Sequence, residues 1–308
     1  MRRLGAVAVA VALLVTGCTA PEEETLDVVV SGEPGERPTI TYRTPLSVDE
    51  TVSTVIWPGS GPELVEGRPA LVDFWLEDAT DATVVKESYS TNPTARILSA
   101  EDLGEDLYET LRGQRVGARL LQVSPAPGNG AADFPTVTVL DVLPTRAAGE
   151  VMTPREGLPA VALADDGSPS ITPSAAEPPT ELVTQQLLRG TGKQVAEGDV
   201  ITVQYTGFSW TTGAPFESTW TSGSPVWFSL DSVPAWSALV EQPVGSQVML
   251  VVPPSYPLGV TQSEELQGQT VVFVIDLLAS RAAATPEVTP APDATAPAGD
   301  GTEPTTEG

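Results

Sequence analysis

The chain has 308 residues, with 41 acidic and 15 basic side chains, no histidine and a single cysteine, so its formal net charge at pH 7 is −26. The absence of histidine excludes Ser-His-Asp catalysis and histidine-ligated zinc, and a lone cysteine excludes an internal disulfide framework. Nucleic acid is not an expected partner of so acidic a chain, because its affinity depends on Lys and Arg; no metal or cofactor is expected.

The N-terminus has the pattern of an export signal. Arg2 and Arg3 precede an apolar run over 4–17, which is shorter than the roughly 20 residues that a membrane-spanning helix needs. The run ends in Val15-Thr16-Gly17-Cys18, which resembles a bacterial lipoprotein processing site. We expect a signal peptide over 1–17, a lipid on Cys18 and a spacer over 18–25. The alternative is an ordinary signal peptide with an incidental cysteine.

These features predict an exported protein that is lipid-anchored to the outer face of the cytoplasmic membrane, within the cell envelope. The acidic body discourages docking on anionic lipid, so the membrane is expected as a partner through the lipid alone. The sequence leaves the oligomeric state open.

An internal repeat occupies the middle of the chain. Pro38-Thr39-Ile40-Thr41 matches Pro169-Ser170-Ile171-Thr172, and the same offset of 131 residues relates Gly59-Ser60-Gly61 to Gly190-Thr191-Gly192. We therefore predict two copies of one fold, over 26–148 and 150–282. The Ser- and Pro-rich stretch 165–179 is interpreted as a loop or linker.

The second copy has the pattern of an antiparallel β-rich domain. Short β-branched runs bounded by Gly or Pro predict strands, and the spacing of Trp236 and Leu239 predicts one short helix over 235–242. The expected strands cover 182–188, 200–205, 248–252 and 270–278. The fold class is α+β, with two domains that each wrap an antiparallel sheet around one short helix. Residues 283–308 lack large apolar side chains apart from Val288, which favours a disordered acidic tail.

A series of short motifs runs through the second copy. In chain order it reads Leu187-Leu188-Arg189-Gly190-Thr191-Gly192, Gly198-Asp199-Val200-Ile201-Thr202-Val203-Gln204-Tyr205-Thr206-Gly207, Gly213-Ala214-Pro215-Phe216-Glu217-Ser218, Val233-Pro234-Ala235-Trp236, Val252-Pro253-Pro254 and Val271-Val272-Phe273-Val274-Ile275-Asp276-Leu277-Leu278. Order and spacing resemble the FKBP-type peptidyl-prolyl cis-trans isomerases over roughly a hundred residues. Both copies are then FKBP-like, the first of them degenerate.

The resemblance implies a shallow pocket for a proline ring, with the indole of Trp236 as its floor. It implies further catalytic residues and substrate contacts: Tyr205, Phe216 and Phe273 as aromatic walls, Glu217 in place of the usual aspartate, Val233 as a backbone contact, Val226 or Trp227 as another wall, and Leu258 in place of a tyrosine, with Tyr256 nearby. The alternative is that Tyr205, Phe216, Trp236 and Phe273 are core aromatics of a small β domain.

Two other regions bear on this hypothesis. Trp210 and Trp220 lie in a polar segment and are either recognition residues or loop packing. In the first copy, Phe74, Val85, Lys86 and Thr138 are expected at the places of Tyr205, Phe216, Glu217 and Phe273, and nothing equivalent to Trp236 is expected before Leu111. The first copy is therefore interpreted as a frame without catalysis.

The resemblance implies an isomerase that helps exported, proline-containing polypeptides to fold, without a cofactor. An alternative is a catalytically inactive FKBP-like module that binds proline-containing partners. A solute-binding lipoprotein is disfavoured, because two small β-rich copies do not match the two-lobed α/β architecture of such proteins.

Overall fold

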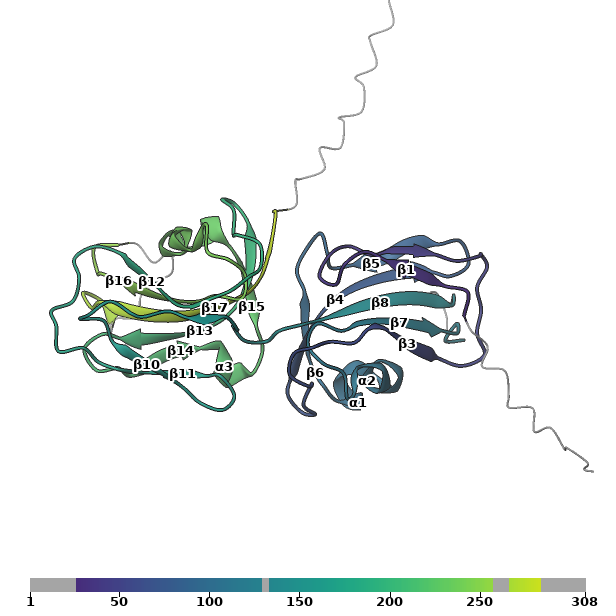
Figure 1. The fold of residues 1–308 in the computed structure, drawn as a ribbon, viewed down its shortest axis with the longest axis horizontal. Coiled ribbons are helices and arrows are strands. Elements are labelled where there is room, and N and C mark those ends of the chain that lie inside the picture. Colours follow the sequence, from purple (N-terminus) through teal and green to yellow (C-terminus); the bar gives the residue numbers. More distant parts are fainter. Residues whose placement is uncertain (1–25, 129–132, 257–265, 284–308) are drawn as a thin grey trace, which may run out of the picture.

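The computed structural model describes residues 26–128, 133–256 and 266–283, which form two β-rich domains connected near residue 147 (Figure 1). The predicted signal peptide, Cys18, the spacer, Leu258 and the predicted tail beyond residue 283 lie outside the described residues. Within the described ranges, no helix is long and apolar enough to cross a bilayer.

The first domain is built on an antiparallel sheet with the strand order β3-β7-β8-β4-β5, and β6 also pairs with β4. A separate β1–β2 hairpin and two short helices complete it. The elements are β1 (Val29–Ser31), β2 (Thr39–Thr41), β3 (Val52–Trp57), β4 (Pro69–Asp78), β5 (Thr83–Glu87), β6 (Thr94–Ile97), α1 (Ala100–Leu103), α2 (Glu105–Leu111), β7 (Arg119–Ser124) and β8 (Thr136–Leu143).

The second domain repeats this plan with the strand order β14-β13-β17-β16-β12-β9, and β15 also pairs with β13. The β10–β11 hairpin corresponds to β1–β2. The elements are β9 (Glu150–Val151), β10 (Ala160–Leu163), β11 (Pro169–Thr172), β12 (Val183–Arg189), β13 (Val200–Ser209), β14 (Pro215–Ser218), α3 (Thr219–Ser222), β15 (Val226–Ser229), the 3₁₀ helices η1 (Leu230–Ser232) and η2 (Pro234–Leu239), β16 (Gln247–Val252) and β17 (Val271–Arg281).

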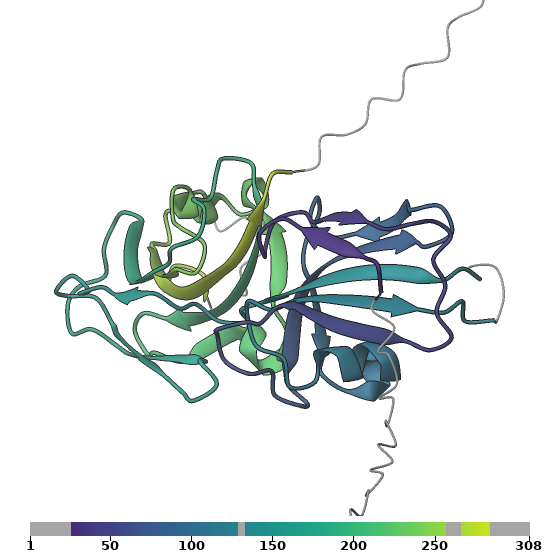
Figure 2. The ribbon, with the colours of Figure 1, turned by 45° about the vertical axis from the view of Figure 1, so that its right-hand side comes forward.

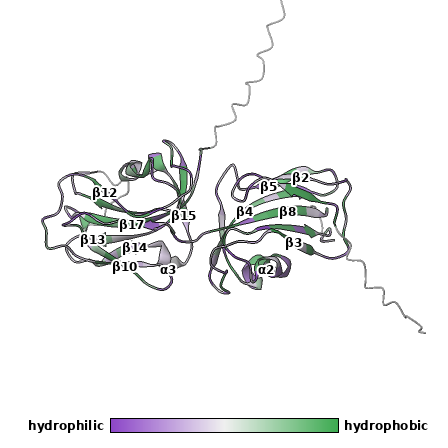
Figure 3. Cartoon of the chain, viewed as in Figure 1, coloured by the Kyte–Doolittle hydropathy of each residue, from purple (hydrophilic) through white to green (hydrophobic). Residues whose placement is uncertain are grey.

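The strand β17 shows why the second sheet is apolar on both faces. Alternate side chains of a strand point to opposite faces. Phe273 and Ile275 belong to the cluster that packs around η2, whereas Val272 and Val274 belong to a cluster on the opposite face. The β10–β11 hairpin covers that second cluster through Val161 and Ile171. Accordingly, the sheet strands of both domains are largely hydrophobic in Figure 3.

The hairpin corrects one prediction, because part of 165–179 is the strand β11 and not a linker. Pro169–Thr172 pairs with Ala160–Leu163, as Thr39–Thr41 pairs with Val29–Ser31 in the first domain. Ile171 is the one large apolar residue among the Ser and Pro residues of this stretch, so its composition did not indicate a strand. The match of Pro169-Ser170-Ile171-Thr172 to Pro38-Thr39-Ile40-Thr41 was the available signal for this strand.

The predicted antiparallel α+β fold class is confirmed, with differences in the helices. The helix expected over 235–242 is the 3₁₀ helix η2, which ends at Leu239; Val240 is already extended and Glu241 has a φ of +67°. In the first domain Gly104, with a φ of +79°, separates α1 from α2.

An ion pair connects the two domains. Arg281, the last residue of β17, donates from Nη2 to Asp73 Oδ2 on β4. The Asp73 side chain is fully buried and Arg281 is 18% exposed. In Figures 1 and 2 the end of β17 (yellow) accordingly lies on the side of the second domain that faces the first.

Candidate functional site

Five aromatic side chains gather around η2 in the second domain, and we call them the aromatic cluster: Tyr205 on β13, Phe216 on β14, Phe228 on β15, Trp236 on η2 and Phe273 on β17. The ring centroids of Trp236 lie 5.3 Å from Tyr205 and 4.8 Å from Phe228, with interplanar angles of 83° and 69°. These edge-to-face arrangements are the preferred packing of aromatic rings.

The aromatic cluster is buried at its base and reaches solvent at one end. Trp236 and Tyr205 are 3% and 5% exposed, whereas Phe216 is 37% exposed. Phe216 packs edge-to-face on Phe273 at 5.8 Å. An exposed phenylalanine that continues a buried aromatic core offers an apolar surface on which a further ring can pack.

Gly207 provides the space for the open end of the aromatic cluster. In the sheet it faces Phe273 on β17 and Glu217 on β14. A Cβ atom at Gly207 would lie 2.5 Å from Phe216 Cζ and 2.9 Å from Phe273 Cε1. The two phenylalanine rings can therefore approach each other because residue 207 has no side chain.

A hydrogen bond orients the acidic side chain at the rim. Tyr205 Oη donates to Glu217 Oε1 over 2.6 Å. Burial, together with this hydrogen bond to a carboxylate, raises the pKa of the Tyr205 phenol well above its usual value, so the hydroxyl stays protonated at neutral pH. Tyr205 is fixed further by its backbone N–H, which donates to Thr219 Oγ1 over 2.9 Å.

The structure brings most of the predicted site residues together. Tyr205, Val233, Trp236 and Phe273 belong to one buried cluster, and Val226 and Tyr256 pack against it. The carbonyl of Val233 accepts the backbone N–H of Trp236 over 2.8 Å. Leu258 lies outside the described residues.

Trp227 does not join the aromatic cluster, and Phe228 takes the place that was expected for Val226 or Trp227. Because side chains alternate along β15, Val226 and Phe228 share the face toward Trp236, while Trp227 points to the opposite face and is 59% exposed. The signal that could have found Phe228 was this alternation, together with Leu230, which is buried in the same cluster.

The two other tryptophans are packing residues. Trp210 is 4% exposed and belongs to the cluster on the opposite face of the sheet. Trp220, in α3, lies beside Gly167, where an added Cβ atom would be 3.1 Å from the indole. Of the two interpretations left open by the sequence, loop packing is the one that fits both.

The first domain has the same frame with different side chains at these places. The pairing of Leu76 with Thr138 and Lys86 corresponds to that of Gly207 with Phe273 and Glu217. Lys86 Nζ lies 5.8 Å from the ring centroid of Phe74. Leu76 has a side chain where Gly207 has none, and Thr138 stands in the place of Phe273, so this domain has no counterpart of the paired phenylalanines.

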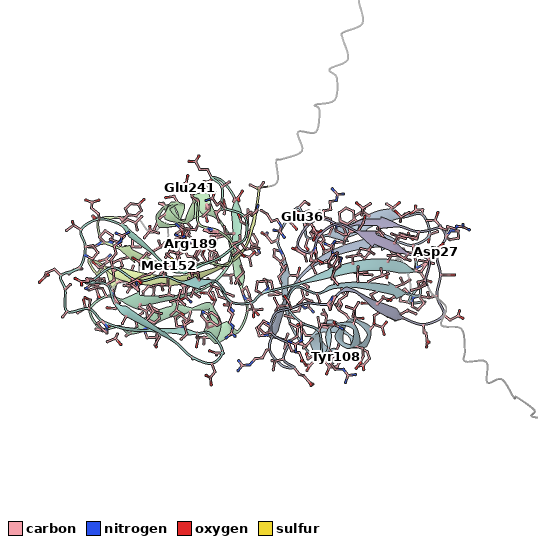
Figure 4. The ribbon with its side chains drawn as sticks, viewed as in Figure 1. Asp27, Glu36, Tyr108, Met152, Arg189 and Glu241 are labelled. Atoms are coloured by element: carbon pink, nitrogen blue, oxygen red, sulfur yellow. The ribbon has the colours of Figure 1, made fainter. Side chains whose placement is uncertain are left out.

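One expectation for the first domain was wrong. Tyr108, labelled on α2 in Figure 4, precedes Leu111 by three residues, as Trp236 precedes Leu239, and packs against the corresponding core cluster. The expectation considered only a tryptophan and so missed this smaller ring. The Arg112 guanidinium lies 5.9 Å from its centroid, so a charged side chain accompanies the ring.

Fold and site together define a small α+β domain that gathers aromatic side chains over a short helix and opens them to solvent at one end. The family model described as FKBP-type peptidyl-prolyl cis-trans isomerase matches residues 191–278, within this domain. The chain belongs to the FKBP family.

Its curated relatives match about a third of the chain. A probable FK506-binding protein of Corynebacterium glutamicum is 32% identical over 105 residues, which are 33% of this chain and 89% of the relative. An FK506-binding protein of Streptomyces anulatus is 28% identical over 118 residues, 36% of this chain and 95% of the relative. The crystal structure of FkpA from Escherichia coli is similar at 27% identity, with a TM-score of 0.31, over 42% of this chain and 54% of that one.

Proposed function

We propose that the second domain is a peptidyl-prolyl cis-trans isomerase that receives a proline ring on the aromatic cluster. The observation that carries the proposal is the arrangement of Phe216 and Phe273 over the space left by Gly207, continuous with the buried Trp236. The description of the matching family, which names this activity, supports the proposal.

The reaction needs no nucleophile, metal or histidine. Interconversion of an X–Pro bond takes tens to hundreds of seconds, because amide resonance imposes a barrier of roughly 18–20 kcal/mol. The twisted amide has lost that resonance and is less polar than the planar one. An apolar surface such as that of Trp236, Phe273 and Phe216 therefore binds the twisted state better than the ground state, which lowers the barrier.

The substrate class and the cellular location are part of the same proposal. With a signal peptide over 1–17 and a lipid on Cys18, the protein acts on exported, proline-containing polypeptides at the outer face of the cytoplasmic membrane. The net charge of −26 supports a tether through the lipid and not through the protein surface.

A binding module without catalysis is the second candidate. The observation that favours it is the engagement of Glu217, whose Oε1 already accepts the Tyr205 hydroxyl over 2.6 Å. In this case proline-containing partners bind on the aromatic cluster, but the twisted amide gains no additional stabilisation.

A proline-isomerisation assay separates the two candidates. The full-length chain is assayed with a tetrapeptide that has leucine before proline, and compared with Trp236→Leu, Phe273→Leu and the control Trp57→Ala, an exposed tryptophan on β3. Circular dichroism checks the folding of each variant. The proposal expects catalysis in the wild type and the control, and a loss of about tenfold or more in the two cluster variants. A folded wild type that binds the peptide without catalysis would establish the binding module.

A further inference from the structure

A groove lies between the two domains, on the opposite face of β15 from the aromatic cluster. Its volume is about 390 Å³, and it is lined by residues 91–95 of the first domain and by Ser224, Pro225 and Trp227 of the second. We call it the interdomain groove. Trp227 is its largest side chain and is 59% exposed.

The interdomain ion pair joins the two sheets that carry the walls of the groove. Val200 on β13 pairs with Ser229 on β15 and, on its other side, with Arg281 on β17, so Arg281 lies across β13 from the end of β15. On the other side, Asp73 follows Val72, which pairs with Thr94 in the groove wall. Asp73 also accepts a hydrogen bond from Ser88 Oγ over 2.9 Å.

The chemistry of the groove suits a neutral polypeptide. None of its lining residues is charged, and Pro225 and the Trp227 indole provide apolar surfaces.

The groove is also within reach of a chain bound at the aromatic cluster. Val226 and Phe228 of β15 pack on that cluster, while Trp227 between them points into the groove. Within the described residues β15 pairs with β13 alone, so its other edge is unpaired there. An extended chain spans about 3.3 Å per residue, so three or four residues bridge the two faces of the strand.

We propose that the interdomain groove binds the segment of an extended, uncharged polypeptide that flanks a proline seated on the aromatic cluster. Trp227 stacks on an apolar side chain of this segment, beside Pro225. The inference rests on the proposed function, since the aromatic cluster has to hold the proline. It adds the first domain to the binding site, as one wall of the groove.

The test measures binding directly, so that it does not depend on catalysis. A fluorescein-labelled neutral dodecapeptide with one central Leu-Pro and a labelled tetrapeptide with the same Leu-Pro are titrated with the full-length chain, and binding is followed by fluorescence anisotropy. The variants are Trp227→Ala and Asn92→Ala, with Trp57→Ala as the matched control for an exposed tryptophan outside the groove. Trp236→Leu tests the aromatic cluster separately.

We expect Trp227→Ala to weaken dodecapeptide binding about tenfold, because a contacting tryptophan commonly contributes more than its neighbours. Asn92→Ala weakens it by a smaller factor, and both variants bind the tetrapeptide as the wild type does. Unchanged dodecapeptide affinity in Trp227→Ala would overturn the inference. The inference would also be overturned if the dodecapeptide bound to a variant that lacks residues 284–308 but not to the full-length chain. In that case the occupant of the groove would be the C-terminal segment of the chain itself.

The result for Trp236→Leu distinguishes a failure of the groove from a failure of the proposed function. If Trp236→Leu weakens both peptides while Trp227→Ala weakens neither, the proline site stands and the groove does not. If Trp236→Leu leaves both peptides unaffected, the proposed function itself is contradicted.

Discussion

Leu76 of the first domain and Gly207 of the second occupy the same place in their sheets, and they show how one frame gives two different surfaces. At Gly207 the absence of a Cβ lets Phe216 and Phe273 approach each other. At the corresponding place of the first domain a leucine pairs with Thr138 and Lys86. The binding surface thus depends on a few side chains, whereas the sheet around them is kept.

Each domain has a buried aspartate on the strand that comes last in its chain order, and the two domains differ in the groups that donate hydrogen bonds to it. Asp141 forms a bidentate pair with Arg119, with two N–O distances of 2.7 Å. Asp276 instead accepts from Gln247 Nε2 over 2.8 Å and from the Ala147 backbone N–H over 2.7 Å. The first domain neutralises its carboxylate with a cation, and the second with uncharged donors.

The largest expected effect is on the stability of the first domain, when Arg119 is replaced by glutamine, the residue type that donates to Asp276 in the second domain. Arg119 is fully buried and also donates to the carbonyls of Gly32 and Glu36, so it holds the N-terminal segment on the sheet. Arg119→Gln leaves Asp141 as an uncompensated buried charge. We expect the free energy of unfolding of the first domain to fall by about 3–5 kcal/mol, measured by urea denaturation.

The exposed pair of Arg112 and Glu109 is the control for this prediction. Arg112→Gln is expected to leave the unfolding midpoint unchanged, because a surface pair contributes little. Equal effects of the two substitutions would show that the buried pair does not stabilise the first domain.

The next effect concerns the pH dependence of the second domain. Burial raises the pKa of Asp276 to about 6, although Ala147 and Gln247 donate to its carboxylate. Between about pH 4 and pH 6 the folded state holds a proton that the unfolded state has released, so this residue makes stability fall as the pH rises through that window. The contribution is about 3 kcal/mol.

Asp276→Asn removes that titration. We expect the wild type to lose stability relative to Asp276→Asn as the pH is raised from 4 to 7, in urea denaturation curves recorded at each pH. A constant difference between the two proteins across this range would contradict the raised pKa.

A smaller effect is expected at the position where the two surfaces diverge. In Gly207→Ala the new methyl group meets Phe216 and Phe273 and separates their rings. We expect kcat/KM for a Leu-Pro tetrapeptide to fall about tenfold, equivalent to about 1.4 kcal/mol of transition-state stabilisation, with the fold retained. Leu76→Gly in the first domain should not change kcat/KM. Unaltered activity in Gly207→Ala would exclude the paired phenylalanines from catalysis.

The smallest effect is expected at Glu217. Its Oε1 accepts the Tyr205 hydroxyl, and Glu217→Gln keeps an acceptor at that place while removing the charge. We expect kcat/KM to fall about threefold or less, because a hydrogen bond to a charged group is stronger than one to a neutral amide. A loss of a hundredfold would assign the carboxylate a direct part in the reaction.

Much of this comparison could be predicted from the sequence, because the repeat aligns the two sheets. Gly207 pairs with Phe273, and Leu76 pairs with Thr138. This agrees with the alignment of the two copies, in which Thr138 is the residue equivalent to Phe273. The frame was predictable since glycine turns and β-branched runs recur at fixed offsets.

Other features could not be predicted, for physical reasons. The choice between Val226 and Trp227 depends on the phase of a short strand, which a one-residue shift reverses. The strand β11 presents few apolar residues, so its composition resembles that of a loop. The ion pair of Asp73 with Arg281 joins residues 208 positions apart and depends on how the two domains dock.

The most direct test of the central claim is an isomerisation assay on full-length variants with matched aromatic substitutions in the two domains. Tyr205 and Phe74 occupy equivalent positions, so Tyr205→Leu is compared with Phe74→Leu, with kcat/KM measured on the same Leu-Pro tetrapeptide. We predict that Tyr205→Leu lowers kcat/KM by tenfold or more, while Phe74→Leu leaves it at the wild-type value. A loss of activity in Phe74→Leu with none in Tyr205→Leu would place the reaction in the first domain and contradict the account.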